Sequence, residues 1–323
     1  MHETGRTESD DFTEIRQRLG RVGVWILNAT TATTPIGVQR REVARIEQLG
    51  YGSVWTGESY GRDIFVLLGT WLAATERIVV GSGIANLWDR PGSTMRAGAD
   101  ALADAYPGRF VLGIGHGYVT RPTVGGRDFT RPLARSREYL DEMDSAAAER
   151  GDGGAVVRAA WPRLLGVNGP RMTALAAERA DGTLPFAGPV AATRQAREIL
   201  GPGKLLIPEQ HVVFDTDPTR ARDAAFAARA AGLAGARARG MDPLDSPYNR
   251  NLLRLGYGEN EIRETSRRVV DATIAYGDGD AIAERIHEHL DAGADHVLLY
   301  LQGTSDLTAT VDRLTAIAAT MPS

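Results

Sequence analysis

The chain has 323 residues, 43% of them hydrophobic, which suits either one large α/β barrel or two modest domains. Its net charge of -4 argues against a nucleic-acid-binding protein, because such domains concentrate basic residues on one surface. The absence of cysteine excludes disulfides, thiolate nucleophiles, iron–sulfur clusters and cysteine-ligated zinc. No run approaches the roughly 20 apolar residues that span a bilayer, so we expect a cytoplasmic protein without a membrane partner.

The expected elements begin after residue 18. Segment 1–18 is polar and acidic and lacks the apolar core of a signal peptide, so we expect a mobile tail before a single domain over residues 19–323. Short apolar runs predict strands over residues 22–27, 53–56, 78–84, 109–114, 163–167, 183–186, 210–214 and 296–301. Longer amphipathic segments predict helices over residues 35–50, 63–75, 93–106, 132–150, 170–180, 189–200, 219–239, 280–292 and 307–319, with more helix before residue 276.

Eight strands that alternate with helices predict an α/β fold of the (β/α)8 TIM-barrel type. Residues 218–277 then form a helical insertion after strand seven and not a second domain. A doubly wound open sheet has the same alternation. The chain lacks Gly-x-Gly-x-x-Gly after its first strand, where an open dinucleotide-binding fold carries it, and this favours the barrel.

The stretch Arg109-Phe-Val-Leu-Gly-Ile-Gly-His-Gly-Tyr118 carries the clearest chemical signal. An apolar run ends at alternating glycines and is followed by an imidazole, His116, and a phenol, Tyr118. In parallel α/β proteins the carboxyl ends of the strands hold the chemistry, so we expect both side chains at the barrel mouth. In the alternative interpretation the glycines only tighten a turn and His116 is an ordinary surface group.

Three other strand ends are chemically loaded. Asn168-Gly169-Pro170 begins a helix, whose free N–H groups and dipole suit an anion, and Arg171 could add a charge. A plain helix cap explains Asn168 equally well. Glu58 could accept a hydrogen bond from a heterocycle or pair with an arginine, and Asn86 ends strand three.

No metal site or serine hydrolase site is indicated. His287 and His289 lie two apart on a predicted helix and therefore diverge, while His211 and His296 lack ligand spacing. No Gly-x-Ser-x-Gly occurs at a strand-to-helix turn.

Taken together, the motifs resemble those of the bacterial luciferase-like flavin and deazaflavin oxidoreductases, and most of all the branch described as coenzyme F-420-dependent. The segments that carry the resemblance are Arg21-Val-Gly-Val-Trp25, Leu49-Gly-Tyr-Gly-Ser-Val-Trp-Thr-Gly-Glu58, Gly81-Ser-Gly-Ile-Ala-Asn86, Tyr106-Pro-Gly-Arg-Phe-Val-Leu-Gly-Ile-Gly115, Pro132-Leu-Ala-Arg-Ser-Arg-Glu-Tyr-Leu-Asp141, Ala176-Ala-Glu-Arg-Ala-Asp-Gly182, Tyr248-Asn-Arg-Asn-Leu-Leu-Arg-Leu-Gly256 and Ala294-Asp-His-Val297. Their order and spacing are more specific than any one of them.

The resemblance implies a barrel mouth that binds a reduced flavin or deazaflavin, with the ring backed by a bulge after strand three. That bulge often carries a non-prolyl cis peptide, which maps to Gly83-Ile84, and the cofactor phosphate would sit at Asn168-Gly169. The implied cofactor-binding residues are Trp25, Gly57, Glu58, Gly83, Ile84, Asn86, Gly115, His116, Asn168, Gly169, Pro170 and Arg171.

Two departures bear on the proton donor. Some relatives place a histidine after the acidic residue of strand two, where this chain has Ser59, and some have a carboxylate near the position of Tyr118. We therefore expect His116, with Tyr118 and Glu58, to be catalytic. In the alternative, His116 only hydrogen-bonds the ring or a phosphate.

The implied activity is hydride transfer between reduced coenzyme F-420 and a small organic substrate. An FMN-dependent monooxygenase and a non-catalytic flavin-binding barrel are the alternatives. We expect a homodimer, and we expect the insertion, with Pro247-Tyr-Asn-Arg-Asn251, to border the substrate side of the mouth or to pack against a dimer partner.

Overall fold

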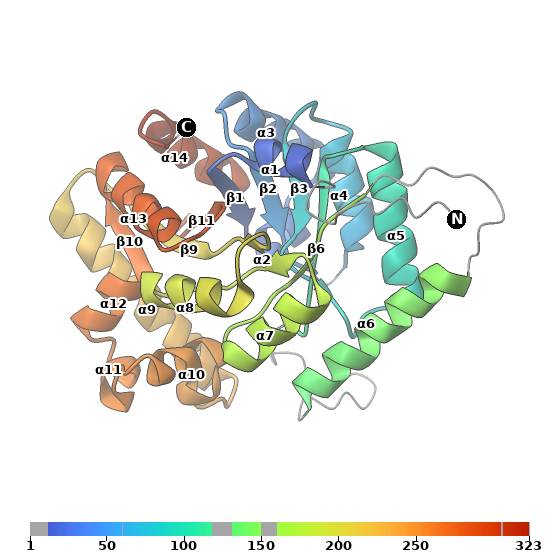
Figure 1. Cartoon of the computed structure of the whole chain (residues 1–323). Coiled ribbons are helices and arrows are strands. Elements are labelled where there is room, and N and C mark those ends of the chain that lie inside the picture. The colour runs from blue at the N-terminus through green and yellow to red at the C-terminus, as the bar shows by residue number, and fades with distance from the viewer. Residues whose placement is uncertain (1–11, 60, 118–130, 150–159, 305, 323) are drawn as a thin grey trace.

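Strands and helices alternate along the chain, and helices surround one curled parallel sheet (Figure 1). The computed structural model describes residues 12–59, 61–117, 131–149, 160–304 and 306–322. The strands are β1 (Val22–Ile26), β2 (Ser53–Thr56), β3 (Val79–Ser82), β4 (Ala85–Asn86), β5 (Phe110–Gly115), β6 (Arg163–Leu165), β7 (Gly182–Thr183), β8 (Leu205–Leu206), β9 (Glu209–Phe214), β10 (Ile274–Gly277) and β11 (Val297–Leu301).

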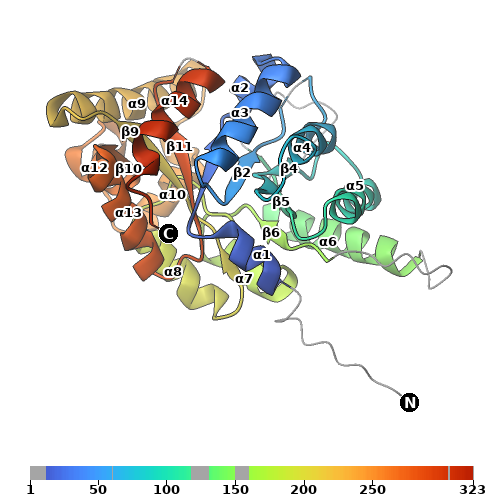
Figure 2. The same ribbon diagram turned by 90° about the horizontal axis from the view of Figure 1, so that it is seen from above.

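The helices lie outside the strands, with α3, α4 and α5 on one side and α9, α12 and α13 on the other (Figure 2). They are α1 (Thr13–Leu19), α2 (Asn28–Thr33), α3 (Ile36–Gln48), α4 (Ile64–Leu72), α5 (Gly92–Ala105), α6 (Pro132–Glu149), α7 (Pro170–Arg179), α8 (Val190–Leu200), α9 (Pro218–Ala238), α10 (Pro247–Arg254), α11 (Glu259–Arg263), α12 (Arg267–Thr273), α13 (Gly279–Asp291) and α14 (Leu307–Ala318), with a 3-10 turn, η1 (Pro243–Asp245). None of these described helices is both long and apolar enough to cross a membrane.

The sheet closes on itself. Its strand order is β10-β9-β11-β1-β2-β3-β5-β6-β7-β8, with β4 beside β5. Strand β9 follows β8 directly in the chain, and hydrogen bonds at this point connect the β7–β8 end of the strand order with the β9–β11 end. The N–H of Glu209 donates to the carbonyl of Pro185 beyond β7 at 2.8 Å, and the N–H of Leu298 in β11 donates to Pro208 at 2.9 Å. The predicted barrel of parallel strands is therefore confirmed.

The two faces of the strands pack against different partners. Apolar side chains inside the barrel form one cluster, made of Trp25, Trp55, Val79, Val111, Leu164, Leu184, Leu205, Ile207 and Leu298 together with Ile15 and Leu19 of α1. Those on the outer face pack against the helices. The interior is tight, because a Cβ on Gly81 would lie 2.2 Å from the Trp55 ring.

Helix α1 occupies residues that were expected to belong to the mobile tail 1–18. It begins at Thr13, and its Ile15 and Leu19 are buried against the barrel interior. These two apolar residues are four apart and therefore share one helix face. Arg16 fixes the helix further through a 3.0 Å ion pair with Asp295.

The segment 218–277 is less purely helical than predicted. It contains α9 to α12, but the expected helix up to residue 276 ends at Thr273, and Ile274–Gly277 forms β10 beside β9. Ile274 and Ala275 are buried in this parallel pairing, which overrides local helix propensity. The Thr-rich residues 28–33 lie between a predicted strand and a predicted helix, where we expect a loop, but they form the short helix α2.

Candidate active site

Aromatic side chains meet at the carboxyl end of the barrel interior. The indole of Trp25, at the end of β1, contacts the rings of Phe186 and Tyr300 edge-on, with centroids 5.5 and 4.8 Å apart. Its Nε1 donates to the carbonyl of Gly83 at 2.8 Å. Trp25 thus connects β1 with the bulge after β3 and with the far wall of the barrel. Its role in cofactor binding stays a prediction.

The bulge between β3 and β4 has the expected form. The peptide bond between Gly83 and Ile84 is cis. The N–H of Gly83 donates to Thr56, and the carbonyl of Ile84 accepts from Glu58, both at 2.8 Å. The Ile84 side chain lies over two other strand ends, since a Cβ on Gly115 or Gly166 would be 3.2 or 2.5 Å from it.

Gly57 belongs to the same wall, because a Cβ there would lie 3.1 Å from the carbonyl oxygen of Gly83. The ends of β2, β3, β5 and β6 therefore present backbone and one aliphatic side chain. A flat ring can approach such a surface closely.

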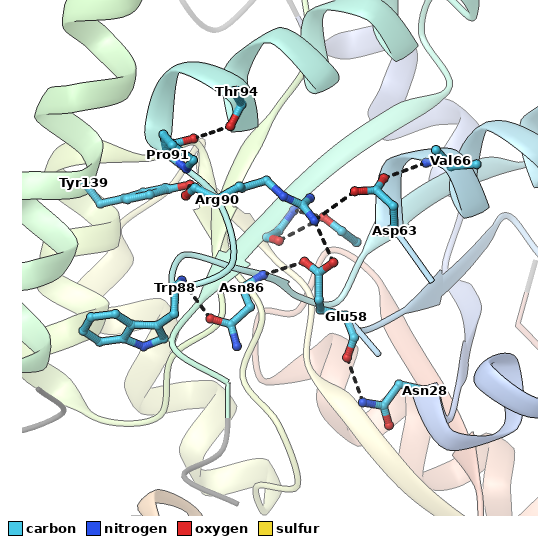
Figure 3. A network of polar contacts seen from close by, with 12 residues as sticks. Asn28, Glu58, Asp63, Val66, Asn86, Trp88, Arg90, Pro91, Thr94 and Tyr139 are labelled. Atoms are coloured by element: carbon cyan, nitrogen blue, oxygen red, sulfur yellow. Dashed lines mark hydrogen bonds and ion pairs between the residues drawn. The ribbon is translucent and has the colours of Figure 1, made fainter. Parts of the chain in front are cut away.

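Glu58 is tied into a polar network outside this wall (Figure 3). Its carboxylate pairs with Arg90 at 2.7 Å and accepts the N–H of Asn86 at 3.1 Å. Arg90 also reaches Asp63 at 3.2 Å, and Asn28 donates to the Glu58 carbonyl at 3.0 Å. Burial raises the pKa of the Glu58 carboxyl, and the charge of Arg90 opposes this.

Both carboxylate oxygens of Glu58 thus have partners in the chain, and Asn86 Oδ1 accepts from the Trp88 N–H at 2.9 Å. The network holds the loop after β4 in place. Pairing of Glu58 with an arginine, one of the two interpretations of the sequence, is confirmed, and its catalytic role stays a prediction.

His116 does not face the barrel interior as expected. It lies beside Trp88, with ring centroids 5.8 Å apart, and lines a small cavity with Tyr139 of α6 and Met172 of α7. The reason is strand alternation: Gly115 packs against Ile84 of the neighbouring segment, so the next side chain points to the other face, toward the helices.

Burial, with the nearby charge of Arg135, lowers the pKa of His116 to about 4. The ring is therefore neutral at pH 7, and its buried Nε2 has no hydrogen-bond partner among the described residues. Its role in proton transfer stays a prediction. Tyr118 lies outside the described residues.

The start of α7 has the expected features of an anion site. Gly169 precedes the helix with φ of 132°, a conformation that favours glycine, and Pro170 occupies its first turn. No side chain caps the helix. Asn168 instead accepts the Phe186 N–H through Oδ1 at 3.0 Å, which excludes the plain-cap interpretation and fixes the loop beside the aromatic cluster.

Arg254 of α10 is the cation at this site that sequence reasoning missed. Its Nη2 donates to the carbonyl of Asn168 at 3.2 Å, and a Cβ on Gly169 would lie 2.5 Å from that nitrogen. Arg171 is exposed on the helix surface. The only sequence signal for Arg254 was its place in the segment 248–256 that carries the family resemblance.

The segment 218–277 therefore reaches the loop that follows β6, and its place on the substrate side of the mouth stays a prediction. Arg229 of α9 is a second cation of this segment, and its charge acts on His211 of β9. Glu209 and His211 on β9 were not predicted as site residues, although a Glu-x-His pair at the start of a strand was visible.

His289 and His296 serve the core. His289 bonds Thr193 and Gln210 at 2.8 Å each, and His296 bonds Ser53 at 2.6 Å. Both rings are buried. Among the described residues no group of three or more His, Cys, Asp or Glu could hold a metal ion.

A parallel barrel with a backbone wall at its mouth and a cation over a helix N-terminus is suited to a flat, phosphorylated cofactor. The model of the luciferase-like monooxygenase family matches residues 21–296, so the chain belongs to this family.

Relatives share different amounts of the chain. A Mycobacterium tuberculosis protein, provisionally named a coenzyme F-420-dependent oxidoreductase, is 32% identical over 174 residues, which are 45% of this chain and 49% of that protein. The chain thus spans about half the length of this relative. The 5,10-methylenetetrahydromethanopterin reductase of Archaeoglobus fulgidus is 25% identical over 284 residues, 78% of this chain and 86% of the reductase.

Solved structures share the fold. The coenzyme F-420-dependent tetrahydromethanopterin reductase of Methanopyrus kandleri superposes with a TM-score of 0.64 at 18% identity, covering 92% of this chain and 97% of the reductase. A type II Baeyer-Villiger monooxygenase from Pseudomonas putida, in complex with FMN, gives 0.61 at 14% identity, covering 94% and 100%.

Proposed function

We propose that this chain is an oxidoreductase that binds the reduced deazaflavin coenzyme F-420 at the barrel mouth and transfers hydride between it and a small organic substrate. The name of the Mycobacterium tuberculosis relative supports the choice of a deazaflavin. The family name and the FMN-bound structure support the alternative, an FMN-dependent monooxygenase. Either one is a flavin-type cofactor with a phosphate group.

The observation that carries the proposal is the position of Arg254 over the first turn of α7. A helix N-terminus and a guanidinium are both anion ligands, and here they lie together. Asn168 links this point to the interior, because it bonds the backbone of Phe186, whose ring contacts Trp25. A phosphate at α7 and a ring near Trp25 can belong to one molecule.

The residues at the mouth fit such a group. Gly57, Gly83, Gly115 and Gly166 let Trp25, Ile84 and the Gly83 carbonyl pack closely, so this wall presents mainly backbone and the Ile84 side chain to a flat ring. On the opposite wall, Glu209 Oε1 and Gln302 Nε2 are buried without hydrogen-bond partners in the described part of the chain. Buried polar atoms without partners are costly, so a ligand that satisfies them is expected.

When bound, the cofactor supplies the hydride chemistry. The chain supplies orientation: Trp25 holds the Gly83 carbonyl, and Glu58 with Arg90 holds the loop after β4. Arg254 and the N–H groups of α7 bind the phosphate. The aromatic cluster excludes water from the ring.

The test is an anaerobic titration of the purified protein with coenzyme F-420 and with FMN, followed by fluorescence and then by turnover of the reduced form. We expect the deazaflavin to bind more tightly, because the name of the Mycobacterium tuberculosis relative points to it, while the α7 site would accept either phosphate. Submicromolar binding of FMN without binding of coenzyme F-420 would contradict the proposal and favour the monooxygenase. Binding of either cofactor without turnover would favour the non-catalytic barrel.

A further inference from the structure

A polar cluster, buried at Glu209 and partly exposed elsewhere, lies opposite the glycine wall, on the β9 and β11 side of the barrel. Its members are Glu209 and His211 of β9, Tyr300 of β11, Gln302 beyond β11, and Arg229 of α9. Register places His211 beside Tyr300, and a parallel bridge places Glu209 beside Phe186. Tyr300 in turn contacts Trp25. The cluster therefore lies at the aromatic end of the barrel interior.

Glu209, the carboxylic acid of the cluster, has 1% of its surface exposed. Its Oε2 accepts the N–H of Ala187 at 3.3 Å, whereas Oε1 has no hydrogen-bond partner in the described part of the chain. The nearest ionisable group is His211, whose Nε2 lies 3.5 Å from Oε1. A carboxylate with one hydrogen bond and no cation is unfavourable in such a place.

Burial accordingly raises the pKa of the Glu209 carboxyl to about 8, so it carries a proton at pH 7. Burial and the charge of Arg229 lower the pKa of His211 to about 4, so the imidazole is neutral. Tyr300 keeps its proton too, since burial raises its pKa to about 12.

His211 differs from Glu209 in its access to water. Its side chain is 27% exposed, while that of Glu209 is fully covered. The ring stands edge-on to Tyr300, with centroids 5.0 Å apart, which fixes its orientation. A proton can pass from solvent to His211 and from Nε2 to Oε1 across a gap that a small movement closes.

We propose that Glu209 is the proton donor for the reaction at this site and that His211 returns the proton from solvent. This rests on the proposed function. The substrate class is a small carbonyl compound with apolar substituents, because the remaining walls are Trp25, Phe186 and Tyr300.

The step balances as a two-electron reduction. As hydride adds to the carbonyl carbon, the C=O π pair moves to oxygen and takes the proton of Glu209, so an alcohol O–H forms and the carboxyl O–H breaks. A proton from water then adds to one ring nitrogen of His211 as the N–H of the other passes to the Glu209 carboxylate, so Glu209 is protonated again, His211 is neutral again and hydroxide remains in the solvent. The reduced deazaflavin would supply the hydride with its two electrons and would thereby be oxidised.

The test uses Glu209→Gln, which keeps the shape of the side chain and the bond to Ala187, and Glu42→Gln as control. Glu42 is also buried, 2% exposed, but is paired with Arg45 far from the mouth. Infrared spectra of the protein without cofactor come first. We expect a protonated-carboxyl band at pH 7 that disappears with a midpoint near pH 8, is absent in Glu209→Gln and is retained in Glu42→Gln.

Single-turnover oxidation of bound reduced coenzyme F-420 by a carbonyl compound follows. Glu209→Gln should slow it roughly 10²–10⁴-fold with little change in cofactor affinity. His211→Gln should keep the wild-type rate in this single turnover and slow a separate multiple-turnover assay, a split that a structural role would not produce. A wild-type rate in Glu209→Gln, or equal infrared spectra, overturns the inference while the proposed function stands. Failure of the wild type to bind the deazaflavin overturns the proposed function and with it this inference.

Discussion

Arg109 illustrates how much one side chain can hold in this fold. It directly precedes β5 and is 8% exposed. Its guanidinium donates to the carbonyls of Ile78 at 3.2 Å and Thr75 at 3.0 Å and to the Thr75 hydroxyl at 2.6 Å. These acceptors lie between the end of α4 and the start of β3, so Arg109 ties three elements together.

Replacing Arg109 with lysine should lower the free energy of unfolding by roughly 2–3 kcal/mol, because hydrogen bonds to charged groups contribute about 1.5–3 kcal/mol and lysine cannot form the same fork. Urea unfolding measures this. Arg77→Lys, at an exposed position in the same turn, should change it by less than about 0.5 kcal/mol. Equal effects of the two substitutions would contradict the role of Arg109.

The site residues divide by how far each could be predicted. The cis peptide at Gly83-Ile84, implied by the family resemblance, and the helix start after Asn168-Gly169 were predicted correctly, while the roles of these residues in cofactor binding stay predictions. The direction of His116 was not predicted correctly, because both faces of β5 are buried and its apolar run hides the alternation. Arg254 could not be found from spacing, since it lies 86 residues from Asn168 and reaches it only through the fold.

At the level of elements, eight predicted strands were found because each is a distinct apolar run. The strands that were missed are β4, β8 and β10, which are two, two and four residues long. Ile274–Gly277 continues a helical pattern without a turn signal, and only its pairing with β9 makes it a strand. Helix α1 was missed because its two buried residues are too few for a recognisable period.

For the molecule as a whole, buried histidines make stability depend on pH. Burial, with a smaller effect of Arg285, lowers the pKa of His289 to about 3, and burial lowers that of His296 to about 4. In the unfolded chain these rings bind a proton below about pH 6.5, whereas in the folded chain they do not. The unfolded state then binds more protons, so stability is full above pH 6.5 and falls as the pH drops below it.

His289→Gln should remove one such proton. Between pH 7 and pH 5 the variant should lose roughly 2 kcal/mol less unfolding free energy than the wild type, at about 1.4 kcal/mol per pH unit below 6.5. His287→Gln, two residues away on the exposed face of α13, should keep the wild-type slope. Urea unfolding at both pH values measures the difference, and identical slopes in all three proteins would show that His289 titrates normally.

We expect a phosphorylated deazaflavin to bind with its phosphate at the start of α7, under Arg254. The affinity of coenzyme F-420 for two arginine variants tests this most directly. Arg254→Met should weaken binding roughly tenfold to a hundredfold, the loss expected for one charge-assisted hydrogen bond. Arg171→Met, at an exposed position in the first turn of α7, should bind like the wild type. If Arg254→Met binds as tightly as the wild type, or if Arg171→Met is weakened equally, the phosphate does not sit where this account places it.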